Sequence, residues 1–247
     1  MKRKHTVLAL ALGLSCAAQQ VQAAEATLVP LASAQSGQAP APWRVVGVPG
    51  GKIALTAFAM APLDGRKVLR VTAAQSYGNL VHDLPLVPPA ANLRLSWRWR
   101  LEVGLKGTDL RTRAGDDSPL KVCVLFDMPL ENLGLIERQL LRFARAASAE
   151  KLPSATLCYV WDELLSPETL LPNAYTSRVR LIVATSSTTT ALGQWVAHTR
   201  DVAADFRRAF GAESERLPPM MAVLVGADAD NTGGHSLGFV DDVQLAH

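Results

Sequence analysis

Residues 220–245 have the sequence MMAVLVGADADNTGGHSLGFVDDVQL. An apolar run leads into a polar connection, residues 228–234, and a second extended run, residues 236–245, follows it. Asp, Asn and Gly tolerate positive φ and bond their own backbone, so we expect two strands joined as a β-hairpin. The polar connection is also where we expect a polar site, if the chain has one.

The rest of the chain has the same β-rich character. Its 247 residues are enough for one β-sandwich with a full core. Short apolar or alternating runs, separated by turn residues, predict strands near 68–72, 77–84, 93–101, 121–126, 155–161 and 178–185. We therefore expect an all-β fold, a jelly-roll-like antiparallel sandwich over residues 52–247, preceded by a loosely ordered N-terminal segment at 24–51.

The first residues have the three parts of a signal peptide. Lys2, Arg3 and Lys4 are basic, residues 7–14 are apolar, and Val21-Gln22-Ala23 is a cleavage site of small residues. The apolar part is too short to span a bilayer. We expect removal of residues 1–23 and a periplasmic or secreted protein, with Cys16 lost with the leader.

The leader also explains the net charge. The chain has 25 Lys and Arg against 22 Asp and Glu, and three of the basic residues lie in the leader. The mature chain is then formally neutral, so no global charge favours nucleic acid as a partner. We also expect no transmembrane segment in the mature chain.

Residues 93–101, LRLSWRWRL, have the cleanest strand pattern in the chain. Leu and Trp alternate with Arg and Ser, which predicts one buried and one basic face. If this strand shared a sheet with residues 178–185, five guanidinium groups would line one surface and could bind acidic polysaccharide. The alternative is a solvated face whose arginines pair with Asp and Glu of neighbouring strands. The five residues are Arg94, Arg98, Arg100, Arg178 and Arg180.

Two segments have helical rather than strand periodicity. Residues 131–151 carry apolar side chains at helical spacing with three arginines outside them, which predicts an inserted amphipathic helix. Its basic face could dock a membrane, although a solvated face is expected. Residues 201–210 predict a second, short helix with Asp201 as N-cap and Gly211 at its end.

Cys123 and Cys158 remain after removal of the leader, each in an apolar, strand-like run. An oxidising compartment permits a disulfide between them, and two buried free thiols are the alternative. No Cys and His spacing resembles a zinc site.

The connection at 228–234 also matches the start of a calcium loop, with Asp228, Asp230 and Thr232 as ligands. The twelfth position is Phe239 instead of Glu, which excludes an EF-hand. Calcium is thus a possible cofactor, and no other cofactor is expected. The alternative is a turn in which Asp and Asn bind backbone N–H groups without metal.

Residues 234–238, GHSLG, match the nucleophile elbow of α/β-hydrolases. We reject this interpretation, because the elbow needs a helix after the serine and an acid and a histidine later in the chain. Paired Asp side chains and scattered aromatic residues remain as candidates for a binding site or for glycoside cleavage. The candidate ligand-binding residues are Arg98, Arg100, Asp116, Asp117, Trp161, Asp162, Tyr175, Arg178 and Trp195. No catalytic residue can be assigned.

Six short motifs, in this order, resemble the secreted bacterial domain-of-unknown-function family 3047. They are Gly115-Asp-Asp117, Tyr159-Val-Trp-Asp162, Tyr175-Thr-Ser-Arg178, Gly193-Gln-Trp195, Arg200-Asp201 and Asp228-x-Asp-Asn-Thr232. The likeness runs from about Val68 to Leu245 and implies an exported β-sandwich without an assigned activity. The last strand also resembles the closing strand of jelly-roll lectin-like and carbohydrate-binding domains.

These observations favour an exported envelope protein with a non-catalytic binding domain, and a glycan or polysaccharide is the expected ligand. A carbohydrate-active hydrolase or lyase using the Asp-rich loops is the first alternative. A structural or interaction module of an envelope complex is the second. A groove lined by Trp, Tyr and Arg would favour sugar binding, whereas a flat apolar patch would favour the interaction module.

Overall fold

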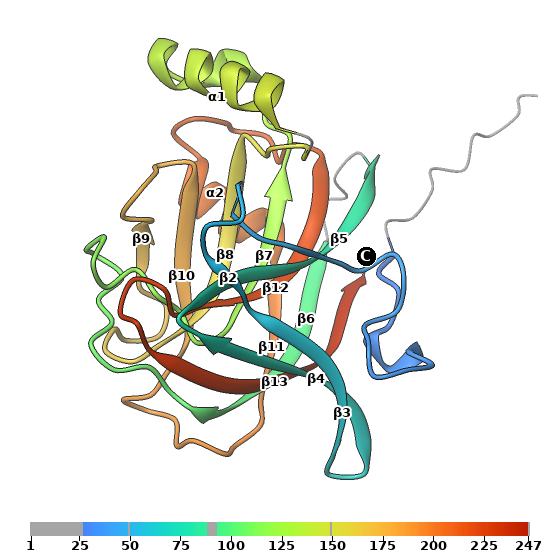
Figure 1. Cartoon of the computed structure of the whole chain (residues 1–247). Helices are drawn as coiled ribbons and strands as arrows, with labels where there is room; N and C mark the ends of the chain where they lie inside the picture. The colour runs from blue at the N-terminus through green and yellow to red at the C-terminus, as the bar shows by residue number, and fades with distance from the viewer. Residues whose placement is uncertain (1–26, 49, 88–92, 149, 247) are drawn as a thin grey trace, which may run out of the picture.

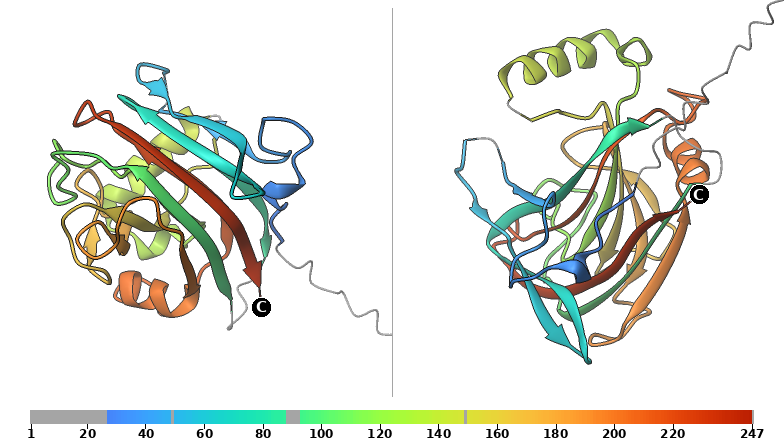
Figure 2. Two further views of the ribbon diagram at one scale, coloured as in Figure 1. Left: turned by 90° about the horizontal axis from the view of Figure 1, so that it is seen from below. Right: turned by 90° about the vertical axis from the view of Figure 1, so that its right-hand side faces the viewer.

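The computed structural model describes residues 27–48, 50–87, 93–148 and 150–246 (Figure 1). The predicted leader, residues 1–23, lies outside this part of the chain. Two β-sheets pack face to face, with one helix at an end of the sandwich and a second against its side (Figures 1 and 2). The predicted β-sandwich with two helices is confirmed.

The larger sheet, called sheet A here, has eight strands. Its strands are, in spatial order, β1 (Arg44–Val46), β5 (Ser76–Val87), β12 (Met220–Asp228), β7 (Lys121–Phe126), β8 (Ala155–Asp162), β10 (Val179–Ser186) and β9 (Leu170–Pro172), with β2 (Ala54–Leu55) paired to β5. Most pairs are antiparallel, but β10 pairs with β8 and β2 pairs with β5 in parallel. The chain runs from β8 through the edge strand β9, which is antiparallel to β10, and β10 therefore runs parallel to β8.

The smaller sheet, sheet B, has five strands. They are, in order, β11 (Val196–Asp201), β6 (Arg94–Val103), β13 (His235–Ala246), β4 (Arg66–Ala74) and β3 (Ala57–Leu63). β5 pairs with β12 in sheet A, while β4 and β6 both pair with β13 in sheet B. The last two strands, β12 and β13, are thus each flanked by strands from earlier in the chain, as in a jelly roll.

The connection between β12 and β13 corrects the expected hairpin. β12 lies between β5 and β7 in sheet A, and β13 lies between β4 and β6 in sheet B, so the two strands do not pair. Residues 229–234 therefore cross from one sheet to the other, and we call them the arch. Residues that tolerate positive φ suit such a crossing as well as a tight turn, and Gly233 has a φ of 65°.

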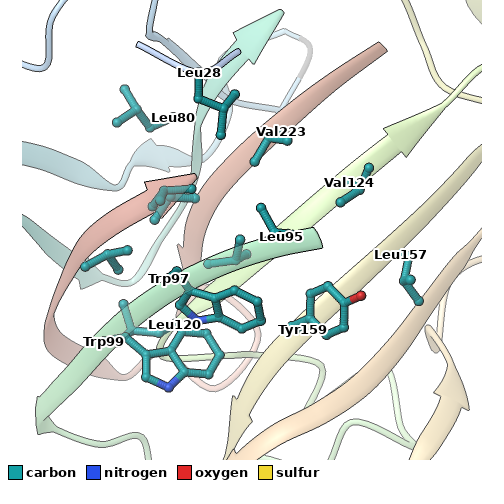
Figure 3. Close-up of a cluster of buried hydrophobic side chains, with 14 of the residues drawn as sticks. Leu28, Leu80, Leu95, Trp97, Trp99, Leu120, Val124, Leu157, Tyr159 and Val223 are labelled. Carbon is teal, nitrogen blue, oxygen red and sulfur yellow. The ribbon is translucent and has the colours of Figure 1, made fainter. Parts of the chain in front are cut away.

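The core between the sheets is rich in aromatic side chains (Figure 3). The predicted alternation of β6 is confirmed, since Leu95, Trp97, Trp99 and Leu101 are buried and the residues between them are not. Trp97 packs on Tyr159 of β8 with ring centroids 5.1 Å apart. Full burial of such side chains stabilises each by about 2 kcal/mol or more.

The N-terminal segment is better ordered than its composition predicts. Leu28, Leu31 and Trp43 are buried in the core, and the indole of Trp43 donates to the carbonyl of Val29 over 2.8 Å. The segment also contains a short 3-10 helix, η1 (Leu31–Ser33), and strand β1. A few anchoring side chains fix it, although it lacks periodicity.

Helices α1 (Leu135–Ala147) and α2 (Val202–Phe210) fall within the predicted ranges. A short 3-10 helix, η2 (Leu130–Asn132), precedes α1. The carboxylate of Asp201 caps α2 by accepting from the amide of Ala204, as expected. In contrast, α1 has no buried residue, so its apolar face is not part of the core. In the described part of the chain, no helix is long and apolar enough to cross a membrane.

Cys123 and Cys158 occupy paired positions on β7 and β8, and their sulfur atoms, 2.11 Å apart, form a disulfide.

We expect the Cys123→Ala/Cys158→Ala variant to lose about 3 kcal/mol of unfolding free energy, because the bridge restricts the unfolded chain over a separation of 35 residues. Urea unfolding measures this loss. Reductant should lower the wild type to the level of the variant and leave the variant unchanged. Two titratable thiols in the unfolded, unreduced wild type would contradict the bridge.

Candidate functional site

A groove of about 1480 Å³ crosses the outer face of sheet A, the face turned away from sheet B. It extends from the α1 end of the sandwich, where Arg145 and Leu152 line it, to the loop end, where Asp116 and Tyr175 line it. Ligand pockets commonly have volumes of about 300–1,000 Å³. The groove can therefore hold an extended ligand.

The floor of the groove is aliphatic. Successive residues of a strand face opposite sides, so Val122 and Val124 enter the core while Cys123 and Leu125 face the groove. Val81, Val160, Leu181 and Leu224 complete a second apolar cluster around the disulfide. Sheet A is thus apolar on both faces.

The loop end of the groove contains a buried ion pair. The ammonium of Lys121 lies 2.8 Å from one oxygen of Asp228 and 4.8 Å from the centre of the Tyr77 ring. The other oxygen of Asp228 accepts from the amide of Ser118 over 2.8 Å. Burial lowers the pKa of Lys121, but the negative charge of Asp228 outweighs it and raises this pKa above its usual value. The lysine is therefore a permanent cation.

Asp116 is the carboxyl group whose protonation can change near neutral pH. It is buried, lines the groove, and accepts a hydrogen bond from the amide of Asn173 over 2.5 Å. The pKa of Asp116 is raised to about 6, because the effects of burial and of the nearby Asp228 outweigh the Asn173 hydrogen bond, which lowers this pKa. Asp116 can thus act as a hydrogen-bond donor or acceptor depending on pH.

The adjacent Asp117 has a different role. One of its oxygens accepts from the amide and the hydroxyl of Thr232 over 2.7 and 2.6 Å, and the other accepts from the amide of Asn231 over 3.2 Å. The two Asp-rich segments noted in the sequence therefore meet. Asp117 fixes the arch, and Asp116 is left facing the groove.

Two buried polar atoms beside this cluster lack partners. Asn79 donates through its amide nitrogen to the hydroxyl of Tyr77 over 3.0 Å, but within the described residues its side-chain oxygen has no hydrogen-bond partner. One carboxylate oxygen of Asp230 is also buried without a hydrogen-bond partner among the described residues. Burial, with the charges of Asp117 and Asp228, raises the pKa of Asp230. Both residues line the groove, and unpaired buried polar atoms are costly unless a ligand or water binds them.

The calcium prediction finds no support in this geometry. Within residues 27–48, 50–87, 93–148 and 150–246, no three His, Cys, Asp or Glu side chains are grouped to hold a metal ion. Of the three predicted ligands, Asp228 is bound to Lys121 and Thr232 to Asp117, while Asp230 lines the groove. Calcium binding stays a prediction.

Three of the predicted ligand-binding residues lie together on the outer face of sheet B. The guanidinium of Arg98 lies 4.5 Å from the ring centre of Trp195 and 2.7 Å from Asp241. Arg100 binds Glu102 over 2.6 Å, and the Trp195 indole donates to Asp64 over 3.0 Å. Carboxylates therefore neutralise this face.

The prediction that five arginines line one surface is wrong. Arg94, Arg98 and Arg100 belong to sheet B, whereas Arg180 lies on β10 of sheet A and Arg178 directly precedes that strand. Both arginines of the second pair bind Glu213, over 2.6 and 2.7 Å. Two alternating strands give the same pattern whether or not they share a sheet, so the sequence could not place them together.

The remaining predicted residues have structural positions or lie at the groove. Trp161 is fully buried in the core and donates to Ser187 over 2.9 Å. Asp162 is buried and accepts from the backbone amides of Leu164 and Leu165. Tyr175 is half exposed at the groove, and its hydroxyl donates to Asn231 over 2.8 Å. Only Asp116 and Tyr175, of the nine predicted ligand-binding residues, line the groove.

Sequence reasoning placed a polar site at residues 228–234, and Asp228, Asp230 and Asn231 of this connection do line the groove. It missed the other polar groups at the loop end, namely Tyr77, Asn79, Lys121 and Asn173. They come from separate segments and share no motif. Lys121 alone had a signal, because a single cation directly before the apolar run VCVLF requires a nearby carboxylate.

The fold and the groove define a jelly-roll-like β-sandwich with a long groove across the outer face of one sheet. The chain belongs to the family described as "Protein of unknown function (DUF3047)", whose model matches residues 41–244. The resemblance stated from the six motifs is thereby confirmed. A search of curated proteins gave no match.

Solved structures with a similar arrangement include TmCBM61 in complex with β-1,4-galactotriose, with 12% identity, a TM-score of 0.35, and coverage of 85% of this chain and 91% of that one. The family 11 carbohydrate-binding module from Clostridium thermocellum, in complex with a mixed-linked tetrasaccharide, has 10% identity, a TM-score of 0.39, and coverage of 86% and 92%. The K3 adhesin domain of Lys-gingipain from Porphyromonas gingivalis has 13% identity, a TM-score of 0.35, and coverage of 84% and 93%. Similarity at this level supports no inference about function.

The pKa of Asp116 predicts a pH-dependent stability. A pKa raised to about 6 means that the folded state holds this proton more tightly than the unfolded state does. The resulting stabilisation is complete below about pH 4 and is lost as the pH rises through about 6. Asp116→Asn should therefore gain stability relative to the wild type as the pH rises from 4 to 8, reaching about 3 kcal/mol, measured by urea unfolding at each pH.

Asn173→Ala is the matched variant for this measurement. It removes the hydrogen bond that lowers the pKa of Asp116, so the pH at which stability is lost should move upward. A stability difference between Asp116→Asn and the wild type that does not change with pH would contradict the raised pKa.

Proposed function

We propose that this chain is an exported, non-catalytic binding domain that holds an extended, uncharged glycan in the groove of sheet A. The observation that carries the proposal is the groove itself, with its aliphatic floor and a cluster of hydrogen-bonding groups at the loop end. A sugar ring combines apolar C–H faces with a polar edge of hydroxyl groups. The aliphatic floor can pack against the C–H faces, and the polar cluster can bind the hydroxyl groups.

The polar cluster offers both donors and acceptors. The ammonium of Lys121 can donate, Asn79 and Asp230 each border the groove with an oxygen that has no partner within the described residues, and the ring of Tyr175 provides an apolar surface beside them. Vicinal hydroxyl groups need this mixture, because each hydroxyl both donates and accepts. Such placed polar groups in a mostly apolar groove are the usual composition of a ligand site.

The charge at the loop end favours an uncharged ligand. At the loop end the carboxyl groups of Asp116, Asp228 and Asp230 lie beside Lys121, and Asp228 already neutralises this lysine. An acidic polysaccharide would bring further negative charge into this partly buried environment. This consideration replaces the acidic polysaccharide that the arginine-rich strand predicted.

The matched variants for a binding test are Tyr175→Ala in the groove and Trp195→Ala on the outer face of sheet B. We expect the mature protein to bind a neutral β-glucan or galactan oligosaccharide and not alginate, measured by calorimetry after a glycan-array screen. Tyr175→Ala should weaken binding about tenfold, which corresponds to about 1.4 kcal/mol, because it removes an aromatic contact. Trp195→Ala should bind like the wild type.

Two outcomes would overturn this assignment. Loss of binding in Trp195→Ala but not in Tyr175→Ala would place the ligand on sheet B. An array without any neutral glycan bound would reject the ligand class.

A second candidate function, glycoside cleavage, is favoured by Asp116 alone. A buried carboxyl group with a pKa of about 6 has the property needed of a general acid. The nearby Asp228 is held by Lys121, which disfavours it as the second carboxylate of such a pair. Release of reducing ends from the bound glycan, lost in Asp116→Asn, would favour this function over simple binding.

Export rests on the leader sequence, and the Cys123–Cys158 disulfide supports it, because such bonds persist in oxidising compartments. We expect the intact mass of the protein recovered from the cell envelope to begin at Ala24. A mass that begins at Met1, or at a lipid-modified Cys16, would contradict this cleavage site.

A further inference from the structure

Helix α1 is attached to the sandwich by its polar side. The hydroxyl of Ser177 donates to Glu137 over 2.5 Å, and Arg145 donates to Asp127 and to the carbonyl of Leu152, each over 2.9 Å. Arg138 donates to the carbonyl of Glu131 over 2.9 Å. These contacts fix the orientation of the helix and leave its other side turned outward.

The outward side is apolar. Ile136, Leu140 and Phe143 are spaced by four and three residues, which places them in one stripe, and they are 78%, 64% and 73% exposed. Leu135, at the start of the helix, is 77% exposed. In an ordinary surface helix these side chains would face the core, whereas here only Leu141 of α1 packs partly against it within the described residues. A group of large exposed apolar side chains marks an interaction surface.

The charges of α1 are segregated in the same way. The helix, LIERQLLRFARAA, contains three arginines and a single acid, Glu137, and that acid is turned toward Ser177 and Arg178. Arg142 is also exposed on the helix. The exposed surface of α1 therefore combines apolar and basic groups, and the single carboxylate of the helix, Glu137, is engaged by Ser177 and Arg178.

The position of α1 allows contact with a flat surface. The helix lies beyond the ends of the strands at one end of the sandwich, and it is the outermost element there (Figures 1 and 2). The loop after it, with Leu152 and Pro153, borders the groove. A surface that touches the apolar stripe would meet the molecule without covering sheet A.

We propose that α1 docks on the surface of an anionic lipid bilayer, with its axis parallel to the membrane plane. Ile136, Leu140 and Phe143 enter the boundary between head groups and acyl chains, and Arg142 binds a lipid phosphate. A helix with a strongly apolar face and Lys or Arg on its polar face binds membranes in this way. A second copy of the chain is the less suitable occupant, because two such helices would bring like charges together.

Vesicle co-sedimentation of the mature protein tests this proposal. We expect binding to vesicles of phosphatidylcholine with phosphatidylglycerol, weaker binding to phosphatidylcholine alone, and a decrease with added salt. Leu140→Ser/Phe143→Ser should lower the partition coefficient by more than about tenfold. Arg142→Glu should weaken binding to the anionic vesicles only.

The control variant is Leu192→Ser, which changes a 49% exposed leucine in the loop before β11 and should bind like the wild type. Because the altered side chains of α1 are exposed, the Leu140→Ser/Phe143→Ser and Arg142→Glu variants should keep the thermal midpoint of the wild type. Absence of vesicle binding, or equal binding by the wild type and the α1 double variant, would overturn the proposal. So would a wild-type dimer in light scattering that the double variant dissociates, since a second copy would then cover the stripe.

Discussion

The hydrogen bonds from the arch to the Asp117 carboxylate fix the connection between the two sheets. The arch joins β12, an inner strand of sheet A, to β13, the middle strand of sheet B, so its position sets how these two strands face each other. The same contact brings Asn231 and Asp230 beside Lys121 and Asp116. One buried carboxylate therefore contributes to the sandwich and to the polar end of the groove at once, which a separate loop on the surface would not achieve.

The sequence predicted local structure well and relative placement poorly, for physical reasons that differ between elements. The alternation of β6 predicted its buried tryptophans, because one side of a strand in a sandwich must be apolar. The arch was mistaken for a hairpin, since Asp, Asn and Gly permit either path and only pairing with distant strands decides between them. Periodicity located α1 but assigned its apolar stripe to the inside, because a helical period identifies a face without saying what covers it.

The candidate site was harder to predict than the fold because adjacent or similar residues have opposite roles. Asp116 and Asp117 are neighbours in sequence, yet one faces the groove and the other holds the arch. Trp161 and Tyr175 both looked like sugar platforms, yet the first is fully buried between the sheets and the second is half exposed. Such differences arise from strand register and loop packing, which the sequence of a single chain does not contain.

The two outer faces of the sandwich obey different rules, and this difference was present in the sequence. In sheet B the outer residues of β6 are arginines paired with Asp and Glu, as expected for an antiparallel face in contact with water. In sheet A, β7, β8 and β12 have the continuous apolar runs VCVLF, ATLCYVW and MMAVLV, a pattern of strands covered on both faces. One face of those strands meets sheet B, and the other forms the floor of the groove. A continuous apolar run in a sandwich with too few elements to cover it is therefore a sign of a binding face, and in this chain it locates the groove more directly than any of the charged or aromatic motifs.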